Sequence, residues 1–164
     1  MRGLWGLLRA FAMAAWGHRH QRDKGGRLYW HHLVRVAWLA YGLSGGDLDA
    51  AIVGLLHDYL EDVDPHAGAI IARCFGGPVA RAVSCLTRPG NVSYGKYIAR
   101  IAAMRRDLDD RVLAVKLADL LDNTQPGRVD PESYDYRPNF DRLYGYIQAL
   151  AVLTARRALR GLGV

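Results

Sequence analysis

The sequence predicts an all-α fold, organised as a single domain over residues 1–164. Apolar residues recur at helical spacing through most of the chain. No segment shows a convincing strand pattern, and no internal repeat is present. Hydrophobic residues make up 51% of the chain. A chain of this length can bury about two thirds of its unfolded surface, so it needs no disulfide to form a core.

The first two predicted helices flank a basic loop. Residues 3–16 place apolar side chains at the spacing of an amphipathic helix. Arg9 interrupts this stretch and no clear small-residue cleavage site follows, so we expect a helix packed on the domain and not a signal peptide. Residues 18–27 are basic and contain glycines, which fits either a solvated loop or an electropositive lip for phosphates. The second helix is predicted over residues 29–43, with His32 in its first turn.

A third helix is predicted over residues 48–62, with Asp47 as its N-cap. Its last turns carry one imidazole and three carboxylates: His57, Asp58, Glu61 and Asp62. Asp58 and Asp62 are like charges one turn apart, which destabilises a helix by about 0.2–0.5 kcal/mol. A bound cation would relieve this repulsion, and an adjacent His and Asp offer a nitrogen and an oxygen to one metal ion. The alternative is a solvated loop entry, which is the usual role of acidic residues at a helix end.

The later helices are separated by Gly and Pro breaks. They are predicted over residues 69–75, 79–86, 94–104, 112–124 and about 139–160. Ser93 is a suitable N-cap, and the arginines near the end of the last helix suit its negative pole. Residues 125–138 read as a polar loop rich in Pro, Asp and Tyr.

The helix over residues 112–124 places Lys116, Asp119 and Asn123 on one face. An aspartate inside such an apolar run would cost several kcal/mol if it were buried without a partner. Either Lys116 or a metal ion would neutralise Asp119. The second and third helices form an antiparallel pair with a short connection, which is expected to bring His32 beside His57.

The bulk properties limit the partners. The formal net charge is +6 and the sequence pI is about 9.6, which suits an anionic ligand such as a nucleotide, a nucleic acid or a phosphorylated metabolite. No helix carries a concentrated DNA-recognition face, so a nucleic acid is not favoured. No apolar run approaches the roughly 20 residues of a membrane span. Cys74 and Cys85 lack a zinc-like spacing and are expected to be reduced thiols of a cytoplasmic protein.

Three segments, in this order, resemble the HD-domain metal-dependent phosphohydrolases. Residues 29–32 match the family's Tyr-x-x-His, residues 55–62 match Leu-Leu-His-Asp-x-x-Glu-Asp, and residues 115–123 match Val-Lys-Leu-Ala-Asp-x-x-x-Asn. Within that superfamily the sequence is most similar to the hydrolase domain of the Rel/SpoT alarmone enzymes and to the small stand-alone alarmone hydrolases. The resemblance covers about residues 10–155 and implies a compact multi-helix bundle.

The resemblance also implies roles for individual residues. One divalent metal ion, usually Mn²⁺ in the family, would be held by four side chains: His32, His57, Asp58 and Asp119. Glu61 and Asp62 would align or deprotonate a metal-activated water, or protonate the leaving group. Contacts to a phosphorylated nucleotide would come from Arg22, Lys24, Lys116 and Asn123.

The implied activity is (p)ppGpp 3′-pyrophosphohydrolysis. The alternatives are hydrolysis of another nucleotide, or a non-catalytic nucleotide-binding module of the same fold; a homo-oligomer remains open. The chain departs from the family at three places: Asp23 replaces an arginine whose role Arg22 could take, Leu33 replaces a proline, and Gln125-Pro126 replace a threonine. These departures touch the nucleotide pocket and not the metal ligands.

Overall fold

A computed structural model of the chain describes residues 3–23, 26–104, 106–125 and 136–161. This part of the chain is all-α, as predicted: it contains helices and no strand, apart from one isolated antiparallel bridge between Arg22 and Leu28. Among the described residues, no helix combines the length and the apolar character that crossing a bilayer requires.

Nine helices follow one another in the described residues. They are α1 (Gly3–Gly17), α2 (Trp30–Leu43), α3 (Leu48–Leu56), α4 (Tyr59–Asp62), α5 (Gly68–Phe75), α6 (Gly77–Leu86), α7 (Tyr94–Ala103), α8 (Arg106–Asn123) and α9 (Tyr136–Leu159). α8 and α9 begin earlier than the apolar periodicity predicted, at Arg106 and Tyr136. Their first turns are polar, so a pattern of apolar residues could not mark them.

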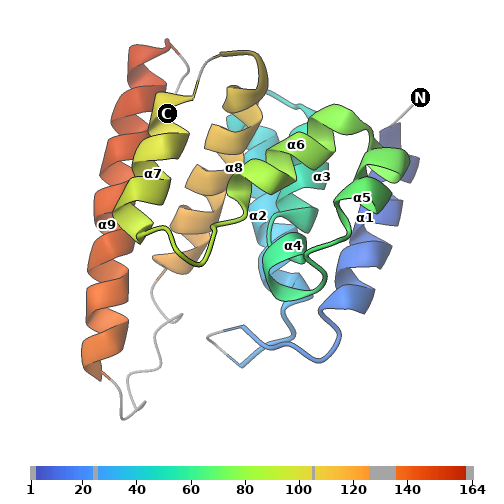
Figure 1. Ribbon diagram of the computed structural model, residues 1–164, viewed down its shortest axis with the longest axis horizontal. Coiled ribbons are helices and arrows are strands. Elements are labelled where there is room, and N and C mark those ends of the chain that lie inside the picture. Colours follow the sequence, from blue (N-terminus) through green and yellow to red (C-terminus); the bar gives the residue numbers. More distant parts are fainter. Residues whose placement is uncertain (1–2, 24–25, 105, 126–135, 162–164) are drawn as a thin grey trace.

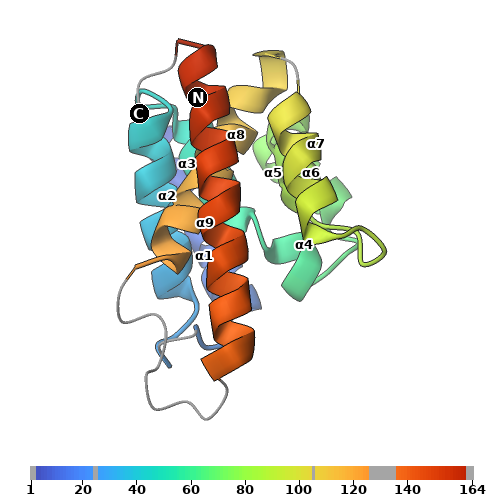
Figure 2. The same ribbon diagram turned by 90° about the vertical axis from the view of Figure 1, so that its left-hand side faces the viewer.

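Three helices form the centre of the molecule. α2 packs on both α3 and α8, and α3 also contacts α8. Figure 1 shows α1 on one side of this group and α9 on the other, and Figure 2 shows α9 running along α8. α5 and α6 form a pair, and α6 reaches α3 and α8. The central helices are therefore covered on several sides, and they supply most of the site described below.

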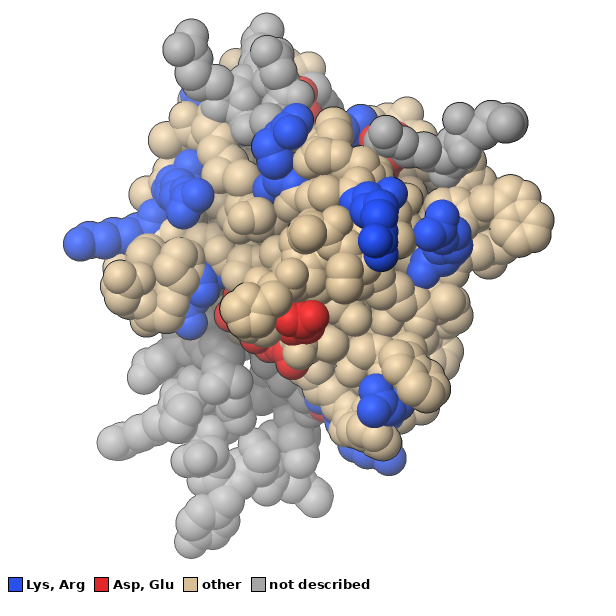
Figure 3. Space-filling view, turned by 45° about the vertical axis from the view of Figure 1, so that its right-hand side comes forward, with Lys and Arg blue, Asp and Glu red and all other residues tan. Residues whose placement is uncertain are grey.

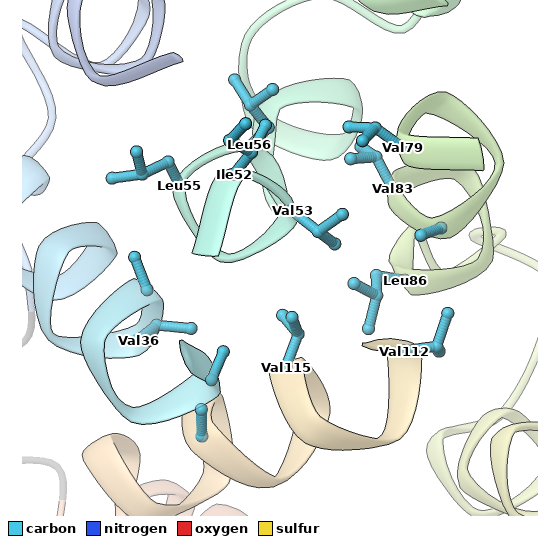
Figure 4. Close-up of a cluster of buried hydrophobic side chains, with 14 of the residues drawn as sticks. Val36, Ile52, Val53, Leu55, Leu56, Val79, Val83, Leu86, Val112 and Val115 are labelled. Carbon is cyan, nitrogen blue, oxygen red and sulfur yellow. The ribbon is translucent and has the colours of Figure 1, made fainter. Parts of the chain in front are cut away.

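The core lies between α2, α3, α6 and α8. Val36, Val53, Val83 and Val115 each come from a different one of these helices, and all four are fully buried. Their side chains point toward a common centre in Figure 4. Burying a side chain of this size contributes about 1.5–3 kcal/mol relative to leaving it exposed. The valines therefore hold the four helices at a fixed separation.

The close crossing of α2 and α3 depends on Gly54. A Cβ atom at this position would lie 2.8 Å from the Cα of Ala37 and 3.0 Å from its backbone nitrogen, closer than real Cβ atoms come. Only a glycine lets the two backbones approach this far. The start of α2 consequently lies beside the end of α3, as the short connection between them predicted.

The expected continuous helix over residues 48–62 is wrong, because the chain is interrupted at His57 and Asp58. The predicted N-cap is present: the Asp47 carboxylate accepts a hydrogen bond from Asp49 N. Asp58 has φ −97° and ψ 0°, which ends α3 and turns the chain. Its carbonyl accepts from the backbone nitrogens of Glu61 (3.1 Å) and Asp62 (2.8 Å), and these bonds start the short helix α4.

Candidate metal centre

Three side chains that could hold a metal ion come together from α2, the turn after α3, and α8. The ligand atoms of His32, His57 and Asp119 lie within 4.8 Å of one another, and all three residues are buried. Asp119 Oδ1 lies 3.4 Å from His32 Nε2 and 3.7 Å from His57 Nε2. Two imidazole nitrogens and a carboxylate oxygen are ligands that suit a divalent transition metal.

The hydrogen bonds of His57 leave one ring nitrogen for such an ion. Nδ1 donates to the carbonyl of Gly54 at 2.8 Å, so in the neutral ring the lone pair is on Nε2. Nε2 is buried and has no hydrogen-bond partner among the described residues. Asp58 Oδ2 lies 2.9 Å away, but the contact lacks hydrogen-bond geometry. A buried nitrogen without a partner, surrounded by carboxylates, fits a metal ligand.

His32 is oriented by a second carboxylate. Its Nδ1 lies 2.7 Å from Asp122 Oδ2, and Arg35 Nε donates to the other oxygen of Asp122 at 2.6 Å. This leaves Nε2 of His32 directed at Asp119. A carboxylate that hydrogen-bonds the second ring nitrogen is the usual support for a metal-ligating histidine. No role for Asp122 was predicted from the sequence; the available signal was its position about one helical turn after Asp119.

Asp58, the fourth predicted ligand, lies beside this group of three. Its Oδ2 lies 3.9 Å from His32 Nε2, in addition to its 2.9 Å contact with His57. The hydroxyl of Tyr29 donates to the same oxygen at 2.5 Å. The structure thus brings together all four side chains that the sequence nominated as ligands, and it adds Tyr29 as a support for Asp58.

Asp119 is shared between a cation of the protein and the ligand cluster. Lys116 Nζ lies 2.7 Å from Oδ2, and the Asn123 amide donates to Oδ1 at 2.5 Å. Burial acts to raise the pKa of Asp119, but Lys116 and the two histidines outweigh it and hold that pKa well below its usual range. Lys116 therefore balances one oxygen of Asp119, while the other faces the histidines.

The acidic surroundings also set the protonation of the histidines in the metal-free site. Burial acts to lower the pKa of His57, but Asp58 and Asp119 outweigh it and raise the pKa to about 10. Burial acts to raise the pKa of Asp58, but His57 lowers it to about 2. For His32 burial dominates, and its pKa is lowered. Without a metal, the two carboxylates therefore favour the positively charged ring of His57, with a hydrogen on both nitrogens.

The cluster opens into a cleft of about 660 Å³. This volume lies in the range of small-molecule binding sites. Glu61 and Asp62 line the cleft, and both are held in place: Glu61 Oε2 accepts from the backbone nitrogen of Arg88 at 3.1 Å, and Asp62 Oδ2 accepts from Gln21 Nε2 at 2.9 Å. Two candidate proton-transfer groups therefore stand beside the candidate metal ligands.

Some of the predicted substrate contacts line the cleft and others do not. Lys116 and Asn123 line the cleft. Arg22 does not: its guanidinium donates to the carbonyl of Gly26 at 2.9 Å. Asp23 lines the cleft instead, with one carboxylate oxygen accepting from Arg27 N and the other 3.4 Å from Arg35. Lys24 lies outside the described residues.

Four further cleft residues received no functional role from the sequence: Arg88, Tyr94, Tyr97 and Tyr146. Tyr94 and Tyr97 stand three residues apart in α7, a spacing typical of the buried apolar face of a helix. That holds for most of Tyr97, which is buried and donates to the carbonyl of Leu86 at 2.5 Å. Arg88 lies two residues after the end of α6, and a cation close to a helix end was the only local signal.

Basic side chains are dispersed over one face of the described part of the molecule. On the face in Figure 3, Lys and Arg side chains are scattered across the full width, while the largest group of acidic side chains gathers near the centre. This face carries no continuous basic stripe of the kind that follows a nucleic-acid backbone.

Comparison with known proteins identifies the family. Residues 10–137 match the family model described as HD domain. The chain belongs to the HD domain family. The resemblance drawn from the three motifs is thereby confirmed, and the histidine of α2, the His-Asp pair after α3 and the aspartate of α8 all fall inside the matched residues of this HD domain.

Curated relatives of this HD domain are long proteins. One is a guanosine-3′,5′-bis(diphosphate) 3′-pyrophosphohydrolase of Aquifex aeolicus, 37% identical over 122 residues, which are 73% of this chain and 17% of that protein. Another is a GTP pyrophosphokinase of Streptomyces coelicolor, 34% identical over 125 residues, which are 73% of this chain and 14% of that protein. The HD domain thus spans less than a fifth of the length of these two relatives.

A solved structure supports the fold of this HD domain. It is described as a metazoan ortholog of SpoT that hydrolyzes ppGpp and plays a role in starvation responses. The TM-score is 0.73 and the alignment covers 96% of both chains, with 22% sequence identity. At this level of identity the likeness establishes a common architecture.

Proposed function

We propose that this HD domain is a metal-dependent phosphohydrolase that removes the 3′-diphosphate of ppGpp and pppGpp. The observation that carries the proposal is the meeting of His32, His57 and Asp119 within 4.8 Å in a cleft also lined by two acidic side chains. The named activity of the Aquifex aeolicus relative supplies the substrate class.

We propose Mn²⁺ as the metal, held by His32, His57 and Asp119 with Asp58 as the fourth protein ligand. The mixed nitrogen and oxygen ligand set suits this ion. When bound, the metal supplies a Lewis acid, which lowers the pKa of a water molecule and polarises a phosphoryl oxygen. Asp122 and Tyr29 keep two of the ligands oriented through hydrogen bonds of 2.7 and 2.5 Å.

The reaction is the hydrolysis of a phosphate ester. The oxygen of water attacks the phosphorus bonded to O3′, the bond from phosphorus to O3′ breaks, and O3′ takes a proton as diphosphate is released. Asp62 and Glu61 are the cleft carboxylates that accept the proton of the water and return one to O3′. Lys116 and Arg88 offset the charge that develops on the phosphoryl group, and Asn123 contacts the ribose.

A second candidate is hydrolysis of a different nucleotide at the same metal site. Asp23 favours it, because an acidic residue lines the cleft where the family usually carries an arginine, and Arg22 does not take its place. A carboxylate at that position removes the cation that would stack on the base or contact a phosphate.

A panel of nucleotides tests both candidates. Purified protein with Mn²⁺ would be offered ppGpp, pppGpp, NADPH, deoxynucleoside triphosphates and a cyclic dinucleotide. We expect diphosphate release from ppGpp that is lost in Asp58→Ala and retained in Asp64→Asn, which removes one negative charge outside the cleft. Turnover of another nucleotide alone would select the second candidate. Nucleotide binding with bound metal and no turnover would refute both and favour a non-catalytic binding module.

A further inference from the structure

A buried histidine lies just behind the cleft. His18 directly follows α1 and is 1% exposed. Its ring stacks on Tyr29 with centroids 4.9 Å apart and meets the ring of Tyr59 edge-on at 6.1 Å. Its Nδ1 lies 2.6 Å from Gln21 Oε1. The two tyrosines therefore fix the plane of the imidazole. Its one polar contact is with Gln21, on the side of the cleft.

The contact between Gln21 and Asp62 determines where the hydrogens of Gln21 and His18 lie. Gln21 Nε2 lies 2.9 Å from Asp62 Oδ2. An ionised carboxylate can only accept, so the amide nitrogen of Gln21 must face Asp62 and the amide oxygen must face the histidine. That oxygen also only accepts, so the hydrogen of the neutral His18 ring is on Nδ1.

This arrangement has a cost at the other ring nitrogen. Nε2 of His18 then carries a lone pair, is buried, and has no hydrogen-bond partner among the described residues. A buried acceptor without a donor is unfavourable, and an apolar residue of similar size would avoid the penalty. The Nδ1–H donor is the polar function of His18 that the structure uses.

The backbone keeps Gln21 at the distance that this contact needs. Gln21 N donates to the carbonyl of His18 at 3.0 Å, and Tyr29 N donates to the carbonyl of Gln21 at 3.0 Å. The side chain of Gln21 is partly exposed, so its amide could rotate freely without an anchor. The buried imidazole provides that anchor.

We infer that His18 is a positioning residue, which acts through Gln21 to fix the carboxylate of Asp62 in the cleft. The inference rests on the proposed function, in which Asp62 takes part in proton transfer. It assigns no direct contact with the substrate to His18 or Gln21. Both residues hold an acceptor oxygen in one orientation before the substrate arrives, which is how a supporting shell contributes to rate.

Four variants test this chain of contacts by kinetics. His18→Leu and Gln21→Leu should each lower kcat for ppGpp about 10–100-fold, while KM and bound Mn²⁺ stay unchanged. The double variant should lose no more than either single variant, because the two residues act as one unit. His18→Asn should recover most of kcat, since its amide nitrogen can occupy the place of Nδ1. His20→Leu, at an exposed position of the same turn, is the matched control.

Unchanged kcat in the single variants, additive losses in the double variant, or failure of the Asn variant to recover would overturn the inference. A readout independent of activity separates it from the proposed function. ¹⁵N NMR of the imidazoles should show His18 with its hydrogen on Nδ1, and Asp62→Ala should shift the Gln21 side-chain amide signals. If the wild type hydrolyses no nucleotide, the proposed function fails. The present inference is refuted separately if the NMR spectra show the hydrogen of His18 on Nε2, or if the Gln21 side-chain amide signals do not shift in Asp62→Ala.

Discussion

Asp119 carries the most demanding role at the scale of single residues, because it faces both Lys116 and the two histidines. Asp119→Ala removes a proposed ligand and leaves the partly buried Lys116 without its counter-ion. We expect bound Mn²⁺ and turnover of ppGpp to disappear together, as measured by metal analysis and by diphosphate release. A variant that kept one Mn²⁺ per chain would show that Asp119 is not a ligand.

Glu61 provides the contrasting case, since it lines the cleft without contributing to the ligand cluster. Glu61→Gln keeps the size of the side chain and an oxygen that can accept from Arg88 N, but it removes the acid–base group. We expect full metal content with turnover lowered about 10²–10⁴-fold. Equal turnover in the two proteins would exclude Glu61 from the mechanism.

Proton release should accompany metal binding. The raised pKa of His57, about 10, means that the metal-free site holds this proton at pH 7. A metal ion needs the unprotonated nitrogen, so binding expels the proton, and affinity should rise with pH, by up to about tenfold per pH unit below the pKa. Calorimetric titrations with Mn²⁺ in two buffers of different ionisation enthalpy would count the protons. Identical heats in both buffers would contradict the expectation.

Gly54 decides the geometry at the scale of helices, because it lets α3 cross α2 closely. Gly54→Ala would force the two backbones apart, and we expect a loss of about 1–3 kcal/mol in the free energy of unfolding. Mn²⁺ affinity should fall as well, since His32 lies on α2 and His57 directly follows α3. Urea unfolding with and without metal measures both effects.

Gly42→Ala in α2 is the matched control. No atom lies within 4 Å of the Cβ that this change would add. Alanine is the better helix former, so this variant should be neutral or gain roughly 0.5–1 kcal/mol. A similar loss of stability in both variants would mean that the crossing is not the cause.

The elements show how far local pattern reaches. Apolar periodicity predicted the helices, and the N-caps Asp47 and Ser93 are both present. The break between α3 and α4 was not predicted, because residues 57–58 include no Gly or Pro and the acidic residues keep the i, i+4 spacing of a helix across it. The turn there is set by packing on other helices, which a local pattern does not record.

The site shows the same limit. Motif order indicated four candidate ligands and the Glu61-Asp62 pair. All of them line one cleft except His57, which is grouped with His32 and Asp119. The supporting pair was not found: Asp122 lies 90 residues after His32 and 87 after Arg35, so no window of sequence contains the contact. Arg22 lies outside the cleft because its guanidinium donates a hydrogen bond to the carbonyl of Gly26. The motif comparison did not predict this position either.

The metal connects distant parts of the chain at the scale of the whole molecule, because its proposed ligands come from α2, the α3–α4 turn and α8. An ion that binds only the folded state stabilises it by about 2.7 kcal/mol at a hundredfold excess over Kd. For a domain of this size that corresponds to about 5–10 °C in Tm. Thermal unfolding with Mn²⁺ and with chelator measures the difference, and Asp119→Ala should show none. A wild-type Tm indifferent to Mn²⁺ would argue against a preformed site.

The proposed ligands come from distant parts of the chain, so metal binding can be used to time one step of refolding. His32 and His57 can meet as soon as the α2–α3 pair forms, whereas Asp119 arrives only when α8 docks across a long loop closure. Free manganese gives a sharp paramagnetic resonance signal that broadens when protein ligands replace its waters. The moment at which that signal fades in a refolding chain would therefore mark the docking of α8, separately from the earlier formation of the helices.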